Sequence, residues 1–454
     1  MAHEIKAPPR QIGFWTCIAL VIGNTIGTGI FLIPAALAPF GWNALYGWGI
    51  TIAGALCLAY VFASLARLMP NAGGTYDYIA SAFGPMAAFF VMWSYWISQW
   101  VTNAALGIGL VSYLTPFAPE FFGRPAVGPL GAIAAVILMT AVALRGVRAS
   151  GSVQIATTML KILPLVAVIL VAAFVLGGGD NSAATAANVA PTPVGPAAIA
   201  GAAALALWPI QGFESVTVPA GRVIDPGRTI SRTLLIGTLL VGILYVLVTL
   251  AVFLLLPSDV AARSSAPLAD LMARVWGSGA GKLIAAFAAI SALGALNGWV
   301  LMQGEVQLVL AERGVFPSFF ARVNRNGMPV YAQILGCSLS VALIAMNLSG
   351  GMIQIYSFII LLATVATLVL YLAGALTMLA LLKRGQATGA ALTGAAILGT
   401  IYAIWTFYGA GAEATAWGAA LLATGIPVYF LTRWRAGSSP AAAGIRAGPP
   451  GSSA

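Results

Sequence analysis

The stretch GNTIGTGIF, residues 23–31, lies within an apolar segment, residues 15–38, that carries no charged residue. Three glycines, an asparagine and two threonines crowd its first part, where a membrane-spanning helix would favour large apolar side chains. Non-helical backbone at membrane depth is tolerated only where it is buried in protein or lines a water-filled cavity. We therefore predict a helix broken at residues 27–29, with freed amide groups that suit a carboxylate. The alternative is that Gly23 and Gly27 only allow close helix packing.

The composition indicates an integral membrane protein. Of the 454 residues, 60% are hydrophobic and only 7% are charged, whereas soluble proteins carry roughly 25% charged residues. The apolar segments are continuous rather than alternating, and most approach the ~20 residues that a helix needs to cross a bilayer. We therefore predict an all-α integral membrane fold with twelve transmembrane helices, at residues 14–38, 45–69, 86–115, 126–144, 153–176, 198–221, 229–256, 280–311, 329–348, 353–381, 388–409 and 413–432.

The basic residues are concentrated on one side of the predicted membrane. If the N-terminus is cytoplasmic, sixteen of the 21 Lys and Arg residues fall on the cytoplasmic side and four on the outer side. This bias follows the positive-inside rule, so we expect both termini to be cytoplasmic. It also accounts for the net charge of +10 without nucleic acid as a partner. The only histidine lies in the N-terminal tail, which argues against a metal site.

A second interrupted helix lies at the corresponding place in the next group of helices. An outer loop rich in Gly, Ala and Pro, residues 177–197, separates five predicted helices from the next five. The sixth helix contains ALWPIQGFES, residues 206–215, where Pro209, Gly212 and Glu214 interrupt the apolar run. Paired interruptions of this kind point to the binding site of a transporter. The second break frees carbonyl groups that suit an ammonium group, so both breaks together suit an amino acid.

The third predicted helix carries a polar stripe within SYWISQWVTN, residues 94–103. Tyr95, Gln99 and Asn103 are spaced four residues apart and share one helix face. Polar groups are costly inside a bilayer, so this stripe is expected to face protein or a cavity. Ser98 and Thr102 flank it, and the alternative is that all of these groups only bond between helices.

Two tryptophans lie near the middle of their predicted spans. Trp208 follows the apolar start of the sixth helix, and Trp299 lies beside Gly294 and Gly298 in the eighth. A tryptophan in a cavity can stack on a cationic group of a substrate. The alternative, that both anchor the protein at the membrane interface, suits their mid-span positions less well.

Three ionisable residues fall within predicted spans: Glu214, Lys161 and Glu305. Such residues are functional candidates by default because the membrane interior opposes charge. Glu214 follows the second break, which makes a proton-linked role plausible. Lys161 could release and regain a proton during transport, and the alternative is that its ammonium group reaches the cytoplasmic surface.

These motifs resemble those of the amino acid–polyamine–organocation transporter superfamily, and in particular its bacterial arginine/agmatine antiporters. The resemblance covers residues 12–431 and rests on GNTIGTGIFLIPA (residues 23–35), PNAGGTYDYIASAFGP (70–85), WPIQGFES (208–215) and GVFPSFFARVN (314–324). It implies an inverted repeat of five plus five helices with broken helices one and six. The corresponding divisions are a cytoplasmic tail at 1–13, repeats at 14–176 and 198–381, accessory helices at 388–432 and a disordered cytoplasmic tail at 433–454.

The resemblance also implies substrate contacts from both breaks and from helices three and eight. The residues are Thr25, Gly27, Thr28, Gly29, Ser98, Gln99, Asn103, Trp208, Gln211 and Trp299. Thr28 and Gly29 would bind the substrate carboxylate, and the carbonyl groups of Thr25, Trp208 and Gln211 would bind the α-amine.

The side-chain end of the substrate would meet other residues. Asn103 and the segment 98–99 would contact its tip, and Trp299 would stack on its middle. Residues implied in gating and in pH coupling are Tyr95, Trp208, Tyr371 and Glu214.

The chain departs from the arginine/agmatine pattern at several places. That pattern has small residues at positions 98 and 99, an isoleucine at Gln211 and a serine at Pro209. It also has no lysine at position 161. The presence of Lys161 here resembles proton-coupled and exchange-type amino acid carriers of the same superfamily.

We therefore predict a secondary amino acid transporter of the bacterial inner membrane that works by alternating access. It would exchange a cationic, arginine-like amino acid for its agmatine-like amine across the lipid bilayer, without cofactor or metal, and it could form a homodimer. The alternative is a proton-coupled permease, or an exchanger, for neutral or broad-range amino acids. An enzyme is disfavoured because no histidine or paired carboxylates occur in the spans. A channel is disfavoured because isolated polar residues suit a closed pocket better than a pore.

Overall fold

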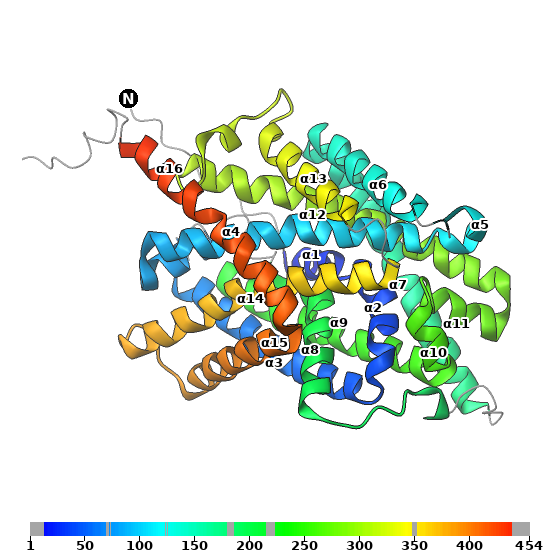
Figure 1. Ribbon diagram of the computed structural model, residues 1–454. Helices are drawn as coiled ribbons and strands as arrows, with labels where there is room; N and C mark the ends of the chain where they lie inside the picture. The colour runs from blue at the N-terminus through cyan, green and yellow to red at the C-terminus, as the bar shows by residue number, and fades with distance from the viewer. Residues whose placement is uncertain are drawn as a thin grey trace, which may run out of the picture.

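The structure is a computed structural model in which the chain forms a bundle of long helices (Figure 1). Within the described part of the chain, the only β pairing is an isolated bridge between Val323 and Pro329. The described residues are 13–69, 72, 74–122, 124, 126–178, 186–214, 223–346 and 352–437.

The principal helices account for each of the twelve predicted segments. They are α1 (Phe14–Thr25), α2 (Gly29–Leu37), α3 (Asn43–Leu68), α4 (Thr75–Ser112), α6 (Val127–Leu144), α7 (Val147–Gly177), α8 (Pro196–Ile210), α9 (Pro226–Leu255), α12 (Ser278–Glu312), α13 (Val330–Ala345), α14 (Met352–Lys383), α15 (Ala390–Ala423) and α16 (Gly425–Gly437). Short elements connect them, namely η1 (Ala38–Phe40), η2 (Thr115–Phe117), α5 (Pro119–Phe122), η3 (Ala186–Asn188), α10 (Ser258–Arg263), α11 (Pro267–Trp276) and η6 (Ser318–Ala321).

Seven helices of the described residues are long and apolar enough to cross a membrane, judged by length and composition. Shorter apolar helices occur at 29–40, 196–210 and 330–345. The protein is therefore an all-helical, multi-pass membrane protein. The inverted repeat and the division into two five-helix units remain predictions, and most of the two predicted tails lies outside the described residues.

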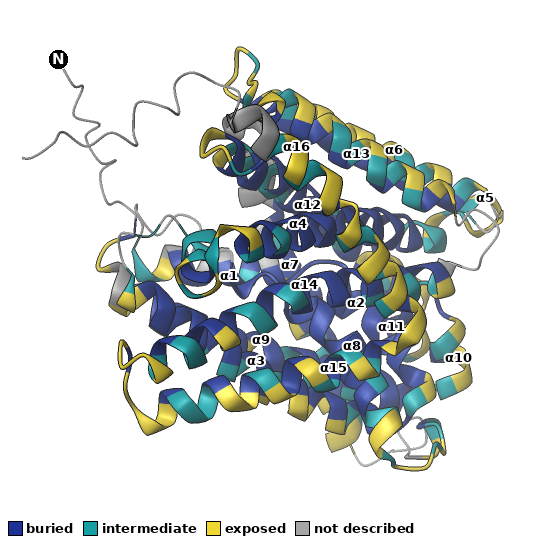
Figure 2. Cartoon of the chain, turned by 60° about the vertical axis from the view of Figure 1, so that its left-hand side comes forward, coloured by how far each residue is buried: buried dark blue, intermediate teal, exposed yellow. Residues whose placement is uncertain are grey.

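Helix α4 forms the centre of the bundle. It packs against α14, α12 and α6, and every residue from 91 to 112 is buried. Exposed residues instead follow outer helices such as α13 and α6 (Figure 2). Because α4 is surrounded by protein, it can carry the polar stripe that a helix facing lipid could not.

The first predicted helix is interrupted as the glycine-rich stretch indicates. Helix α1 ends at Thr25 and α2 begins at Gly29. Ile26 adopts an extended conformation (φ −78°, ψ 96°), which ends the helical hydrogen bonding after its amide donates to Ile22.

The sixth predicted helix also ends early. Helix α8 stops at Ile210, Gln211 is non-helical (ψ 150°), and Gly212 has a φ of +106°. Glycine is the residue that takes this left-handed conformation at least cost. The rest of the predicted span beyond Glu214 lies outside the described residues until 223.

Two predicted boundaries differ from the structure. Helix α4 begins eleven residues before its predicted start of residue 86, and it changes direction at Gly84 (φ 83°). The predicted gap between the last two helices coincides with a kink at Gly411 (φ 84°), after which α15 continues to Ala423.

Candidate functional site

The two helix breaks lie against each other. A Cβ atom added to Gly29, the first residue of α2, would overlap the ring of Pro209 and would lie 3.1 Å from the Trp208 ring. At Gly27 a Cβ would lie 3.1 Å from Ala295 Cβ. The glycines of the first break therefore allow its backbone to approach α8 and α12 closely.

A small cavity lies where these elements meet. Its volume is about 20 Å³, and it is lined by Thr25, Gly27, Gly29, Thr102, Leu106, Trp208, Pro209, Gln211 and Trp299. This volume holds about one water molecule, so the structure is closed around the site. Six of the residues predicted to bind substrate meet here, namely Thr25, Gly27, Gly29, Trp208, Gln211 and Trp299.

The backbone around the cavity offers both donors and acceptors. The first hydrogen bonds of α2 run from the amides of Phe31 and Leu32 to the Thr28 carbonyl. The preceding amides therefore stand at a helix N-terminus, which favours anions. The Thr25 carbonyl accepts a hydrogen bond from the Tyr245 hydroxyl at 2.9 Å, and a carbonyl retains a second lone pair for another donor.

The polar stripe of α4 divides into separate contacts. The Trp208 indole donates to Thr102 Oγ1 at 3.3 Å, and Asn103 Nδ2 donates to Gln303 Oε1 at 2.9 Å. Ser98 Oγ donates to the Tyr95 carbonyl at 2.7 Å. Gln99 is 0% exposed. Ser98, Gln99 and Asn103 thus lie beside the cavity wall rather than on it, and Thr102 is the member of the stripe that lines it.

Two aromatic residues close the cavity from different helices. Trp208 of α8 packs edge-on against Tyr356 of α14, with ring centroids 5.7 Å apart. Trp299 of α12 also lines the cavity and is buried. The predicted pair of tryptophans therefore shares one site, as stacking on a substrate would require.

Glu214 is the centre of a buried hydrogen-bond network. Its Oε1 accepts from the Tyr95 hydroxyl at 3.2 Å, and its Oε2 accepts from the Tyr371 hydroxyl at 2.8 Å and from the Gly212 amide at 3.1 Å. The carboxyl group is 3% exposed. The structure thus brings together the predicted gating and pH-coupling residues of α4, α14 and the second break.

A second cavity borders this network. Its volume is about 130 Å³, and it is lined by Gly74, Thr75, Tyr76, Met92, Tyr95, Glu214, Glu305, Val306, Val309, Leu310, Arg313 and Leu370. Arg313, one of the lining residues, forms a salt bridge of 3.1 Å with Asp77, with side chains 38% and 36% exposed. We call this cavity the acidic vestibule because two carboxylates, Glu214 and Glu305, line it beside the single cation Arg313.

Lys161 lies in the interior. Its ammonium group donates to the Gly23 carbonyl of α1 at 2.7 Å, and the side chain is 1% exposed. The ammonium group therefore ties α7 to α1 just before the first break instead of reaching the surface.

The residues missed by sequence reasoning are those that support the site from a distance. They include Tyr245 of α9, which bonds the Thr25 carbonyl, and Thr367 of α14, whose hydroxyl lies 3.0 Å from Gln211 Oε1. Both are single hydroxyls in otherwise apolar helices, and nothing in the local sequence marks them.

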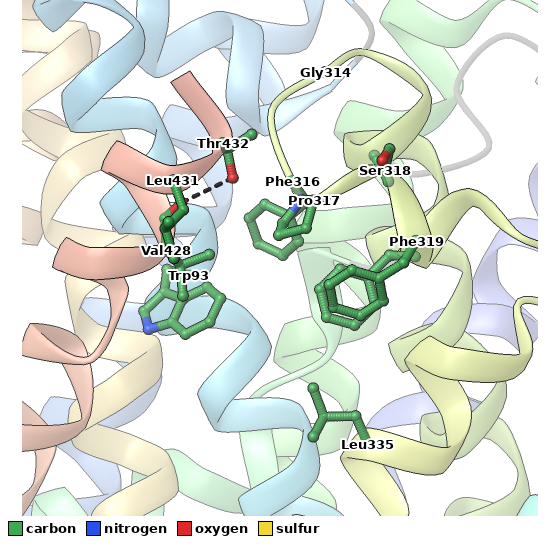
Figure 3. Close-up of a pocket in the computed structure, with 12 residues that line it drawn as sticks. Trp93, Gly314, Phe316, Pro317, Ser318, Phe319, Leu335, Val428, Leu431 and Thr432 are labelled. Carbon is green, nitrogen blue, oxygen red and sulfur yellow. Dashed lines mark hydrogen bonds between the residues drawn. The ribbon is translucent and has the colours of Figure 1, made fainter. Parts of the chain in front are cut away.

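A larger cavity elsewhere does not suit an ionic substrate. It has a volume of about 540 Å³ and lies between α4, α13, α16 and the loop that includes η6 (Figure 3). Aromatic and aliphatic side chains such as Trp93, Phe316 and Leu335 line it, and the hydroxyl of Thr432 donates to the Val428 carbonyl of its own helix. The smaller cavity between the helix breaks is therefore the better candidate for the substrate site.

Comparison with known proteins identifies the family of the chain. Residues 12–432 match the family described as amino acid permease. The chain is 36% identical over 349 residues to a cadaverine/lysine antiporter of Escherichia coli (strain K12), covering 75% of this chain and 77% of the relative. It is 30% identical over 457 residues to a putative arginine/ornithine antiporter of Bacillus subtilis (strain 168), covering 92% and 96%. It is 27% identical over 437 residues to the putrescine transporter PotE of Haemophilus influenzae, covering 95% and 99%.

Proposed function

The chain belongs to the amino acid permease family, and is thus a transporter and not an enzyme, and on this premise we propose that it exchanges a cationic amino acid for the amine formed by its decarboxylation. Arginine and agmatine are the pair that the sequence motifs favour. The relatives add lysine with cadaverine, because one of them is named for that pair, and ornithine and putrescine, because others are named for these compounds. All of these substrates carry an ammonium group and a second cationic end.

The observation that carries this proposal is the meeting of two helix ends around one cavity. The amide groups at the start of α2 suit a carboxylate, whereas carbonyl groups at the ends of α1 and α8 suit an ammonium group. Trp299 and Trp208 offer ring faces for the middle of a cationic chain. A site with these groups binds the amino acid through its carboxylate and its α-ammonium group, and it binds the amine through the ammonium group without a carboxylate.

The closed cavity fits a step in alternating access. A volume of about 20 Å³ cannot hold an amino acid, so substrate entry requires the elements around the breaks to separate. The acidic vestibule borders the network of Glu214 and would receive a cation from one side of the membrane. The cytoplasmic placement that the charge bias predicts for Arg313 would make this the cytoplasmic side.

Counterflow in proteoliposomes tests the proposal. Vesicles loaded with arginine, lysine, ornithine or their amines are mixed with labelled external amino acid, and empty vesicles are the control. We expect uptake that saturates with substrate and that depends on a cationic amino acid or amine inside. Uptake stimulated only by internal neutral amino acids would overturn the assignment of substrate class.

Lys161 supports a second candidate, proton-coupled uptake. Its buried ammonium group contacts the Gly23 carbonyl beside the first break, so loss of its proton would weaken the tie between α7 and α1. In that case a pH gradient should drive net uptake into vesicles that contain no substrate, and Lys161→Ala should abolish it. An exchanger shows no uptake into such vesicles, with or without the lysine.

A further inference from the structure

Gln211 combines burial with an incomplete set of hydrogen bonds at the substrate cavity. It follows the last residue of α8, lines the cavity and is 4% exposed. Its Oε1 lies 3.0 Å from Thr367 Oγ1. Its Nε2, at the other end of the amide, has no hydrogen-bond partner. A buried amide in this situation marks a place where a ligand can supply the missing partner.

The Thr367 hydroxyl decides which end of the amide meets Thr367. Its oxygen is 3.0 Å from the Ala363 carbonyl of its own helix and 3.0 Å from the Gln211 amide. A hydroxyl has one proton to donate, so it cannot serve two acceptor oxygens. Turning the side-chain amide over exchanges its oxygen and nitrogen. With the nitrogen facing Thr367, both contacts become hydrogen bonds: Nε2 donates to Thr367 Oγ1, and the Thr367 hydroxyl donates to the Ala363 carbonyl.

The same arrangement leaves the amide oxygen as the group without a partner. Amide oxygen and nitrogen are assigned from the hydrogen bonds they make. Buried amide N–H groups without acceptors are rarer than carbonyl oxygens that lack a donor. The network therefore favours the orientation in which Gln211 offers an acceptor, rather than a donor, at the cavity.

We propose that the Gln211 side chain, oriented by Thr367, is a specificity-determining residue that accepts a hydrogen bond from the substrate ammonium group shared by amino acid and amine. This inference rests on the proposed function. It assigns a role to the side chain beyond the backbone carbonyl of the same residue. An isoleucine or methionine at this position would leave the ammonium group with backbone carbonyls alone.

The test uses three ligands that separate the two groups of an amino acid. For whichever pair the parent protein exchanges best, the ligands are the amino acid, its decarboxylated amine and the matching acid without the α-amine. Gln211→Met keeps the length of the side chain and removes its polar end. Hydrogen bonds to charged groups are strong enough that we expect it to raise the KM of amino acid and amine together, by roughly ten- to a hundredfold. Competition by the deaminated acid should not change.

Two further variants separate this role from general damage. Thr367→Val should raise the same two KM values by a smaller factor, and Thr367→Ser should restore them, because serine keeps the hydroxyl. Gln307→Met is the matched control, since Gln307 is a fully buried glutamine that does not line the cavity.

Two outcomes would overturn the inference. In the first, Gln211→Met weakens binding of the amino acid and of the deaminated acid but not of the amine, which would show that Gln211 donates its N–H groups to the carboxylate. If all three ligands are unaffected in a monodisperse variant, the side chain is structural. Failure of the parent protein to exchange any cationic pair would instead refute the proposed function, and it is seen before any variant is made.

Discussion

Replacing Gly29 by alanine should slow exchange by disfavouring the closed state. Gly29 begins α2, and its added Cβ would overlap Pro209 Cβ, approach Pro209 Cα to 3.0 Å and approach the Trp208 ring to 3.1 Å. The obstacle includes backbone and a proline ring, neither of which can turn aside. The two helix breaks would therefore have to move apart.

The expected magnitude follows from the cost of overpacking. Adding a methyl group to a packed interior costs typically ~1–3 kcal/mol. Alanine favours helix by about 1 kcal/mol over glycine, but this gain applies to every state in which α2 is helical and so does not offset the clash. The closed state should lose roughly five- to a hundredfold in population relative to open states. Exchange passes through the closed state, and its rate should fall accordingly.

The assay compares initial counterflow rates with binding to the detergent-solubilised protein. We expect the Gly29→Ala rate to fall within that range while binding to the open state is retained. Gly49→Ala is the matched control, because Gly49 lies in the exposed part of α3 with nothing within 4 Å of its added Cβ. A Gly29→Ala protein that exchanges at the parent rate would refute the reasoning that the two breaks must touch during transport.

Three further changes probe other parts of the site. Trp299→Leu should weaken substrate affinity by roughly three- to thirtyfold through loss of the ring that stacks on the middle of the substrate beside its cationic end, and unchanged affinity in calorimetry on a monodisperse variant would contradict its stacking role. Glu214→Gln should flatten the pH dependence of exchange because it removes the titratable group between Tyr95 and Tyr371, whereas overlapping pH–rate curves would place the response elsewhere. Asp77→Asn should change the free energy of unfolding by less than about 1 kcal/mol, because its partly exposed salt bridge with Arg313 is weak. The same change should speed exchange from the vestibule side. A large drop in thermal stability would show that the pair is structural.

The interrupted helices could be predicted because their signals are local. Glycines and a proline within apolar runs mark the ends of α1 and α8 whatever surrounds them. The start of α4 was missed for the opposite reason. Residues 75–85 include an aspartate, two serine or threonine hydroxyls and a proline, and they resemble a loop. Packing against the rest of the bundle keeps them helical up to a kink at Gly84.

The residues that line the candidate cavity were predictable where a residue is unusual for a membrane helix. Trp208, Gln211 and Trp299 fall into this class, and all three line the cavity. The supporting hydroxyls were not predictable, because Tyr245 lies 220 residues from the Thr25 carbonyl that it bonds and Thr367 lies 156 residues from Gln211. Such contacts depend on how distant helices are placed, which no local pattern encodes.

Burial explains how the polar stripe on α4 is used. Its spacing predicted one face directed at protein or a cavity, with bonds between helices as the alternative, and α4 is covered on all sides between residues 91 and 112. Asn103 therefore bonds Gln303 of α12, while Thr102, one residue earlier, turns to Trp208. A helix at the centre of a bundle has several neighbours, so adjacent polar residues form hydrogen bonds with different helices.

Glu214 lines the vestibule, and its carboxylate holds three elements together. Tyr95 belongs to α4, Tyr371 to α14 and the Gly212 amide to the second break, and all three donate to it. Hydrogen bonds to a carboxylate are stronger than those to a neutral group, so protonation of Glu214 would weaken all three contacts at once. A substrate ammonium group that reaches the vestibule would compete with the tyrosines for the same oxygens. Proton and substrate would thus loosen the same barrier, and a pH response and an exchange cycle need not have separate sites.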